Sequence, residues 1–388
     1  MKFVFSFSIL LFFSSTLLSQ KPQEILGIAK EDKSTAYYKE QFDLWSDETQ
    51  KNQKNGYAWR QKYLAQRAFL QKSYPEEWQN EQHKIYNKLD KIIKEAKPHI
   101  DQTFEYYFIK SQNCTGEESV KFSQMAYDID PSRKETYGWL FVNAVIQSNE
   151  DKADELGKRM VANNIYSNAN LLWNLNSLNT MTENSIFIGD GDLDILPKWV
   201  LQHGDDQRKD ILVISKWNMV NDDKYRKSIY EKIGVREPVK KISDFASPTE
   251  YAEYLTLTLL QNGKRKAYMS CGTDVKFFEK NGISDKMYLV GTAYVYSENR
   301  FDNKRVLREN LNKYQLDHLL KNYQNHPEDQ MIDTYMHLSY LPAVLNALEF
   351  YHKNKMSEEI TYYEKILKMV ASKSGREAEV LGWYNPKS

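Results

Sequence analysis

The chain has 388 residues, and its 53 Lys and Arg residues balance 53 Asp and Glu residues, so the formal net charge is zero. This balance argues against nucleic acid or an anionic membrane surface as the main partner. Charged residues make up 27% of the chain while Gly (15) and Pro (10) are few, which favours helices with solvated surfaces over a β-sandwich. The length predicts two or three domains.

The first residues are typical of a secretory signal peptide. Lys2 supplies a positive charge, Phe3–Leu18 is almost wholly apolar, and Ser19 is a small residue before Gln20. Residues 1–19 are therefore predicted to be removed on export, with an uncleaved membrane anchor as the alternative. No later stretch approaches the length of a membrane span, so the mature chain is predicted to have none and to reside in the periplasm or at the outer membrane.

The pattern from residue 20 to residue 182 is helical. Apolar residues recur at steps of three and four, with Lys, Glu and Gln between them. Turn signals separate the segments at Asn55-Gly56, Tyr74-Pro75, Lys97-Pro98 and Asp130-Pro131.

Two helix–turn–helix segments within this region resemble one another. Phe42 is followed seventeen residues later by Trp59, and Phe122 is followed by Trp139 at the same spacing. Self-similar helical hairpins are typical of an α-solenoid, so a TPR-like helical repeat region is predicted over 20–182, with chance similarity as the alternative. In such a repeat both tryptophans would be buried between consecutive helices.

The pattern changes at residue 183 to strands that alternate with helices. The helix ending before Gly234 and the one opening with the capping-box sequence Ser247-Pro248-Thr249-Glu250 carry clear boundary signals. This alternation predicts a small α/β domain with a mostly parallel sheet over 183–300. The predicted strands are Ser185–Ile188, Asp210–Ser215, Ala267–Cys271 and Tyr288–Tyr296.

Residues 301–388 return to the helical pattern. Thr334–Lys353 and Ser357–Val370 are predicted to form an αα-hairpin. The predicted fold class is therefore α/β plus all-α: a TPR-like region, a central α/β domain and a C-terminal helical hairpin.

A resemblance to a known family lies in residues 185–202, which run Ser-Ile-Phe-Ile-Gly-Asp-Gly-Asp-Leu-Asp-Ile-Leu-Pro-Lys-Trp-Val-Leu-Gln. This stretch resembles the motif Gly-Asp-Asn-Asp-Thr-aromatic-Pro-x-Trp-x-x-Gln. The motif belongs to the soluble C-terminal part of the Bacteroidetes membrane-protein family DUF2723, which is protein O-mannosyltransferase-like, and to soluble tetratricopeptide-repeat proteins that share this module. The resemblance extends over about residues 155–300. The matching residues are Gly191, Asp192, Asp194, Pro197, Trp199 and Gln202.

The chain departs from this family in two respects. The membrane-embedded half, where a lipid-linked sugar transferase would act, is absent from this sequence. Leu193, Ile195 and Leu196 replace the motif's Asn, Thr and aromatic residue. The resemblance therefore implies a fold and a compartment more than an activity.

Three acids at alternate positions follow the first strand: Asp190, Asp192 and Asp194. Such a cluster could bind a divalent cation or act in a nucleotide-sugar enzyme. A calcium loop starting at Asp190 fails, because Ile195 and Leu201 occupy the positions that need Gly and Glu. The preferred interpretation is that the acids cap a helix beginning near Pro197, while a ligand role and a catalytic role stay open.

The other chemical candidates are weaker. Cys114 and Cys271 are too few for a disulfide framework and lack neighbours for a zinc site, so both are expected as unpaired or buried thiols. The segment Ser270–Asp274 could hold a thiol nucleophile, but a strand-to-helix turn explains its composition equally well. The histidines are scattered and no Gly-rich phosphate loop occurs. We predict no catalytic residue, metal or cofactor.

These features together favour an exported, non-catalytic scaffold or binding protein of the bacterial cell envelope. Its partner is expected to be a protein in an envelope assembly, with a glycan as the alternative, because solenoid surfaces suit extended partners. The alternative is a glycan-handling enzyme or glycosyltransferase accessory that uses the loop Asp190–Asp194 at the strand ends, where ligands of α/β domains usually bind.

Overall fold

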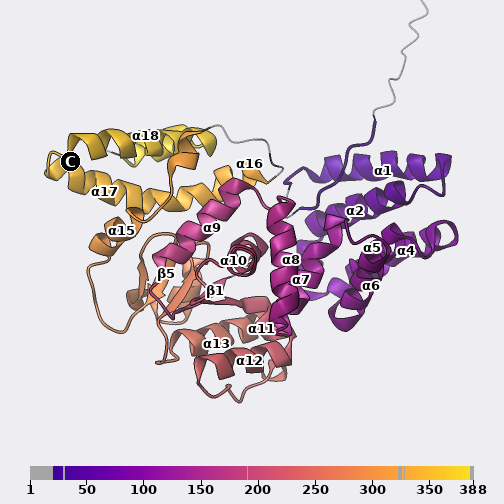
Figure 1. Ribbon diagram of the computed structural model, residues 1–388, viewed down its shortest axis with the longest axis horizontal. Coiled ribbons are helices and arrows are strands. Elements are labelled where there is room, and N and C mark those ends of the chain that lie inside the picture. Colours follow the sequence, from indigo (N-terminus) through magenta and orange to yellow (C-terminus); the bar gives the residue numbers. More distant parts are fainter. Residues whose placement is uncertain (1–20, 29–30, 190, 322–325, 327, 385–388) are drawn as a thin grey trace, which may run out of the picture.

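The computed structural model describes residues 21–28, 31–189, 191–321, 326 and 328–384. The predicted signal peptide and Asp190 lie outside these residues. The described chain is mostly helical with one small five-stranded mixed sheet, in agreement with a mixed α/β and helical class (Figure 1). Within the described ranges, no helix is both long and apolar enough to span a bilayer.

The N-terminal part is helical, as predicted, and its helices pack largely in pairs: α1 with α2, α5 with α6, and α7 with α8 (Figure 1). The turn predicted at Lys97-Pro98 is wrong, because α4 continues through Pro98 and ends at Ile100. A proline there removes only one backbone bond of the last turn. The helices are α1 (Thr35–Lys51), α2 (Gly56–Ser73), α3 (Pro75–Asn80), α4 (Gln82–Ile100), α5 (Phe104–Ser111), α6 (Gly116–Ile129), η1 (Lys134–Thr136), α7 (Tyr137–Ile146) and α8 (Glu150–Ala162).

Trp59 and Trp139, the tryptophans of the two similar helix–turn–helix segments, differ in burial. Trp59 is 5% exposed and its ring stacks on His99, with ring centres 6.1 Å apart. Trp139 is 38% exposed, so its predicted burial is wrong. The first of these segments comprises α1 and α2, which pack on each other. The second comprises α6 and α7, but α6 packs mainly on α5, and α7 packs mainly on α8. Equal spacing along the chain therefore does not place the two rings in equal surroundings.

The sheet has the strand order β2-β1-β3-β5-β4. β1 pairs in parallel with β2 and β3, whereas β5 pairs antiparallel with β3 and β4, so the sheet is mixed rather than mostly parallel. The predicted strand Tyr288–Tyr296 is a hairpin broken at Gly291, where φ is +141° and a Cβ would collide with the Tyr314 hydroxyl. The strands are β1 (Ile186–Gly189), β2 (Leu212–Ser215), β3 (Ala267–Ser270), β4 (Met287–Leu289) and β5 (Ala293–Tyr296).

Helices cover both faces of this sheet. α9 (Asn168–Thr180) and α10 (Asp192–Gly204) lie on one side, and α11 (Lys216–Asn221), α12 (Asp223–Ile233) and α13 (Pro248–Leu260) on the other (Figure 1). The short α14 (Val275–Lys280) follows β3. Two boundary signals are confirmed: Gly234 ends α12 in the left-handed region at φ 78°, and the Ser247 hydroxyl accepts a bond from the Glu250 N–H at the start of α13.

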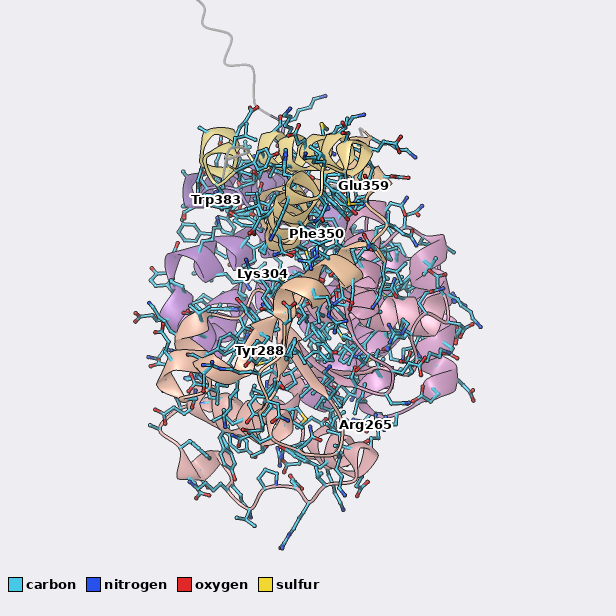
Figure 2. All side chains as sticks on the ribbon, turned by 90° about the vertical axis from the view of Figure 1, so that its left-hand side faces the viewer. Arg265, Tyr288, Lys304, Phe350, Glu359 and Trp383 are labelled. Atoms are coloured by element: carbon cyan, nitrogen blue, oxygen red, sulfur yellow. The ribbon has the colours of Figure 1, made fainter. Side chains whose placement is uncertain are left out.

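The C-terminal part is helical and includes the predicted αα-hairpin, in which the rings of Tyr351 and Tyr363 stack. Figure 2 shows Lys304 of α15 between Tyr288 of β4 and Phe350 of α17, so α15 connects the sheet with the hairpin. The helices are α15 (Asn303–Leu311), α16 (Asp329–Met331), α17 (Leu341–Lys353), α18 (Ser357–Lys373) and α19 (Glu377–Gly382), and the helical segments η5 (Ile332–Met336) and η6 (His337–Tyr340) lie between α16 and α17.

Candidate functional site

The topology singles out the carboxyl ends of β1 and β3. After β1 the chain crosses to β2 on one side, whereas after β3 it continues to β4 and then β5 on the other side. Ligands of open α/β sheets bind most often at such a switch point, outside the carboxyl ends of the strands. The segments that follow the two strands here are residues 190–194, which carry the acidic motif, and residues 271–274.

The start of α10 differs from the prediction. The helix begins at Asp192 rather than near Pro197, and the Gly191 carbonyl accepts bonds from the N–H groups of Asp194 and Ile195. No side chain of a described residue caps this terminus, so the predicted capping role is wrong for Asp192 and Asp194, while Asp190 lies outside the described residues. Asp192 and Asp194 lie in the first turn, where their charges still interact favourably with the helix dipole.

Pro197 consequently lies inside α10 and leaves one carbonyl without its usual helical partner. The missing N–H would have donated to the carbonyl of Leu193, four residues earlier. The side chain of Asn174 on α9 replaces it, donating from Nδ2 to the Leu193 oxygen at 3.1 Å. The motif's proline is therefore accommodated by a side chain of the neighbouring helix.

Asp194 forms a buried ion pair with Lys198, which is 0% exposed. The Lys198 ammonium donates to Oδ1 of Asp194 at 2.6 Å, to its backbone oxygen at 2.9 Å, and to Oδ1 of Asn174 at 2.8 Å. It also lies 4.4 Å from the ring centre of Phe187 and 4.9 Å from that of Trp173. Burial lowers the pKa of Lys198, and the Asp194 charge acts in the opposite direction. The pair lies within α10, and the bond from Lys198 to Asn174 joins α10 to α9.

Asp192 is in a different environment. Its side chain is solvent-accessible, yet desolvation raises the pKa of its carboxyl, and the charge of Arg67 on α2 only partly offsets this effect. Burial also raises the pKa of Tyr166, and the charges of Asp192 and Glu328 add to it. Asp192 therefore faces other ionisable groups of the surrounding helices.

The described residues do not unite the predicted acids in one site. Asp194 is buried against Lys198, Asp192 is accessible, and Asp190 lies outside the described residues. In the part of the chain that the structure describes, no group of three or more His, Cys, Asp or Glu side chains is placed to hold a metal ion.

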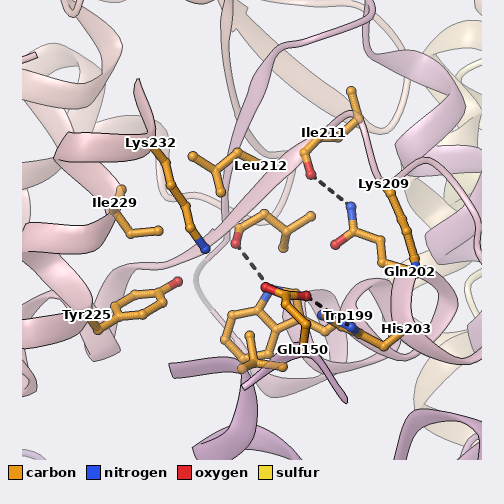
Figure 3. A pocket seen from close by; sticks show the side chains of 12 residues that line it. Glu150, Trp199, Gln202, His203, Lys209, Ile211, Leu212, Tyr225, Ile229 and Lys232 are labelled. Atoms are coloured by element: carbon orange, nitrogen blue, oxygen red, sulfur yellow. Dashed lines mark hydrogen bonds and ion pairs between the residues drawn. The ribbon is translucent and has the colours of Figure 1, made fainter. Parts of the chain in front are cut away.

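Trp199 and Gln202, the last two motif residues, seal the outer edge of β2 (Figure 3). The Trp199 indole donates to the carbonyl of Val213 at 3.1 Å. The Gln202 amide donates to the carbonyls of Ile211 and Arg208, each at 2.8 Å. Positions three apart on a helix share a face, and alternate carbonyls of a strand share an edge, so this spacing matches α10 to β2. Unpaired edge groups are an aggregation risk, which these two side chains reduce.

The two cysteines are free thiols, as expected. Burial raises the pKa of Cys271 to about 12 and that of Cys114 to about 11. Thiols of this kind stay protonated near neutral pH and are poor nucleophiles. Cys271 follows β3 near Asp194, which raises its pKa further.

The residues that sequence reasoning missed are the asparagines of α9. Asn170, Asn174 and Asn176 are fully buried, and each bonds a different part of the molecule. Asn170 donates to Glu328 at 3.2 Å, and Asn176 donates to the Tyr340 hydroxyl at 2.8 Å. Asn is a poor helix former, and burying its amide without hydrogen-bond partners costs free energy. The repeated Asn residues in the helical segment 168–179 could therefore have indicated a buried network of hydrogen bonds.

No protein-family model matches this chain, and no curated protein sequence matches it.

Proposed function

We propose that the chain is an exported, non-catalytic scaffold or binding protein of the bacterial cell envelope, in the periplasm or at the outer membrane. Its partner is a protein of an envelope assembly, and the alternative partner is a glycan. The leader-like residues 1–19 and the resemblance of residues 185–202 to an envelope family support the compartment.

The observation that carries this proposal is the use of the motif's buried polar groups. Asp194 forms an ion pair with Lys198, and the Trp199 indole donates to the carbonyl of Val213. The Gln202 amide donates to the carbonyls of Arg208 and Ile211. Lys198 also bonds Asn174 of α9, so these contacts together hold α10 between α9 and the edge of the sheet. Because the polar groups of the motif bond inside the protein, we infer that the motif serves to maintain the fold. Partner recognition is then left to other surfaces.

The N-terminal helices supply such a surface in this proposal. Their packed pairs are consistent with a TPR-like repeat, in which successive hairpins build an extended face. Tyr57 and Trp139 are 37% and 38% exposed. Arg60 lies over the Tyr57 ring, 4.9 Å from its centre, and bonds Glu135, one helical turn before Trp139. Exposed aromatic side chains of this kind are enriched among the residues that dominate protein interfaces.

Co-purification of the tagged, exported chain from its native envelope tests this proposal. We expect a stoichiometric protein partner that is retained by the variant Asp192→Asn and lost by the double variant Tyr57→Ala/Trp139→Ala. Trp383→Ala is the matched control, because Trp383 is also exposed, at 51%, but belongs to the C-terminal helices. Equal retention by all three variants would count against the N-terminal helices as the partner surface.

The same preparation tests export. N-terminal sequencing is expected to find a mature chain that begins close to Gln20, because Ser19-Gln20 is the predicted cleavage junction. An intact Met1 on membrane-bound protein would instead support an uncleaved anchor.

One observation favours a second candidate, a glycan-handling enzyme or accessory. Asp192 is accessible at the carboxyl end of β1, and desolvation raises its pKa, as is common for acids in functional sites. Titration with methyl glycosides of mannose and glucose tests it. Saturable binding that disappears in Asp192→Asn would promote this candidate over the scaffold.

A further inference from the structure

A second site lies away from the acidic motif, at the outer edge of β2. A cavity of about 170 Å³ is walled by β2, α7, α8, α10 and α12 (Figure 3). Part of its lining is apolar, including Val145, Trp199 and Ile229. Ligand pockets commonly combine such a lining with a few well-placed polar groups, and the polar groups here are mainly hydrogen-bond donors.

The first donor belongs to the edge strand itself. Because β2 pairs in parallel with β1, its alternate residues point their backbone groups outward. Side chains satisfy the outward carbonyls of Ile211 and Val213 and the outward N–H of Ser215. The Val213 N–H points the same way as its sealed carbonyl, and no partner for it occurs among the described residues. This N–H lies on the cavity side of the strand.

Two side chains of α12 add donors on the same wall. The Tyr225 hydroxyl accepts the Ser215 N–H at 3.1 Å, so its own proton is available to a ligand. Burial raises the pKa of Tyr225 and keeps that proton in place. The Lys232 ammonium contacts only the Ser148 hydroxyl, at 3.5 Å, and forms no ion pair within the described ranges. Figure 3 shows the Tyr225 hydroxyl and the Lys232 ammonium both directed into the cavity.

The remaining charges around the cavity are already balanced or negative. Lys209 pairs with Asp206 at 2.6 Å, and His203 bonds Asp154 at 2.7 Å. Glu150 also lines the cavity, and its carboxyl group lies 3.8 Å from Nδ1 of His203. Among the described lining residues, Lys232 is therefore the cation without a carboxylate partner, which suits a ligand with a single negative charge. Repulsion from Glu150 disfavours phosphate and other multiply charged anions.

We propose that this cavity binds a small monocarboxylate with an apolar body. Its carboxylate accepts bonds from the Lys232 ammonium, the Tyr225 hydroxyl and the Val213 N–H. Its hydrocarbon part packs on Val145 and Ile229. This chemistry is shared by free carboxylic acids and by the C-terminal carboxylate of a peptide that ends in an apolar residue.

Titration calorimetry of the full chain near neutral pH and low salt tests the proposal. The probes are 4-methylpentanoate, its neutral analogue 4-methylpentanamide, and inorganic phosphate. We expect saturable binding of the carboxylate, with the amide and phosphate weaker by about tenfold or more. The amide lacks the charge that strengthens the bond from Lys232, whereas phosphate lacks the apolar body and brings additional negative charge toward Glu150. The peptide Gly-Gly-Leu, with a free or an amidated C-terminus, distinguishes the two sources of the carboxylate. If the free peptide binds more tightly than both the amidated peptide and 4-methylpentanoate, the natural ligand is a peptide C-terminus. If 4-methylpentanoate binds more tightly than the free peptide, the natural ligand is a free carboxylic acid.

Two lysine variants locate the site. Lys232→Met keeps the aliphatic stem of an exposed residue and is expected to weaken 4-methylpentanoate binding by about tenfold. Lys209→Met removes an ammonium from the same cavity that is already paired, and it is expected to change affinity by less than about threefold. Unchanged unfolding midpoints confirm that both variants are folded. The proposal is overturned if native protein shows no saturable binding up to about 20 mM, a generous limit for so small a ligand, or if Lys232→Met binds as well as Lys209→Met.

Discussion

Replacing Lys198 by Met is the sharpest test of the proposal that the motif holds α10 against α9 and the sheet. Met preserves most of the side-chain volume but removes the ammonium that contacts Asp194 and Asn174. The Asp194 carboxylate, 8% exposed, would then lose the partner of Oδ1, while Oδ2 has no partner among the described residues even in the native chain. Breaking a buried ion pair by removing one member typically costs about 3–5 kcal/mol, and we expect a loss in that range.

The double variant Asp194→Asn/Lys198→Met separates charge from packing. It removes both charges and leaves an uncharged amide in place of the stranded carboxylate. Replacing both members of a buried pair is often close to neutral, so the double variant is expected to be more stable than Lys198→Met alone by about 2 kcal/mol or more.

Urea unfolding followed by far-UV circular dichroism measures both effects as shifts of the midpoint at a common slope. Lys209→Met serves as the control, because Lys209 is an exposed paired lysine whose loss should cost less than about 1 kcal/mol. A native-like midpoint for Lys198→Met would refute the proposal that Lys198 holds α10 in place. Equal losses in the single and double variants would show that side-chain packing, and not the ion pair, holds α10 in place.

Three further outcomes are expected. Trp59→Ala should cost about 3–5 kcal/mol in unfolding free energy, whereas Trp139→Ala, which removes a 38% exposed ring, should cost about 1 kcal/mol or less; equal losses would contradict the difference in burial. Burial alone would raise the pKa of Glu135, but hydrogen bonding from Arg133 and the charge of Arg60 lower it from 4.5 to about 2. This carboxylate therefore contributes stability that is complete above pH 4.5 and is lost as the pH falls toward 2, and acid titration of Glu135→Gln should lack that part of the decline. Calorimetry with calcium, magnesium and manganese should show no binding below about 1 mM, because Leu193 and Ile195 offer no oxygen ligands beside the acids; tight uptake abolished by Asp192→Asn would contradict this expectation.

Local patterns in the sequence determined most of the elements. Apolar residues at three- and four-residue steps predict α2, α8 and α12, because a helix brings such positions to one face. Gly234 and Ser247 mark boundaries correctly, since a left-handed end needs glycine and an exposed N-terminus needs a side-chain acceptor. These preferences act within a few residues and need no knowledge of the rest of the fold.

Partners distant in the chain decided the rest. Whether Tyr288–Tyr296 forms one strand or a hairpin depends on Gly291 and on Tyr314, which lies against it. The start of α10 at Asp192 depends on the Asn174 amide, which bonds the carbonyl that Pro197 leaves unpaired.

The burial of Lys198 shows the same limit for the candidate site. A lysine between Pro197 and Trp199 has the local sequence of a solvated helix surface, and lysine is almost never fully buried unless it is paired. Asp194 is one turn away in sequence, but Asn174, Trp173 and Phe187 complete its surroundings from α9 and β1. A pattern within one helix can place a charge on a face, but only the elements packed on that face determine whether the charge meets water or partners in the protein interior.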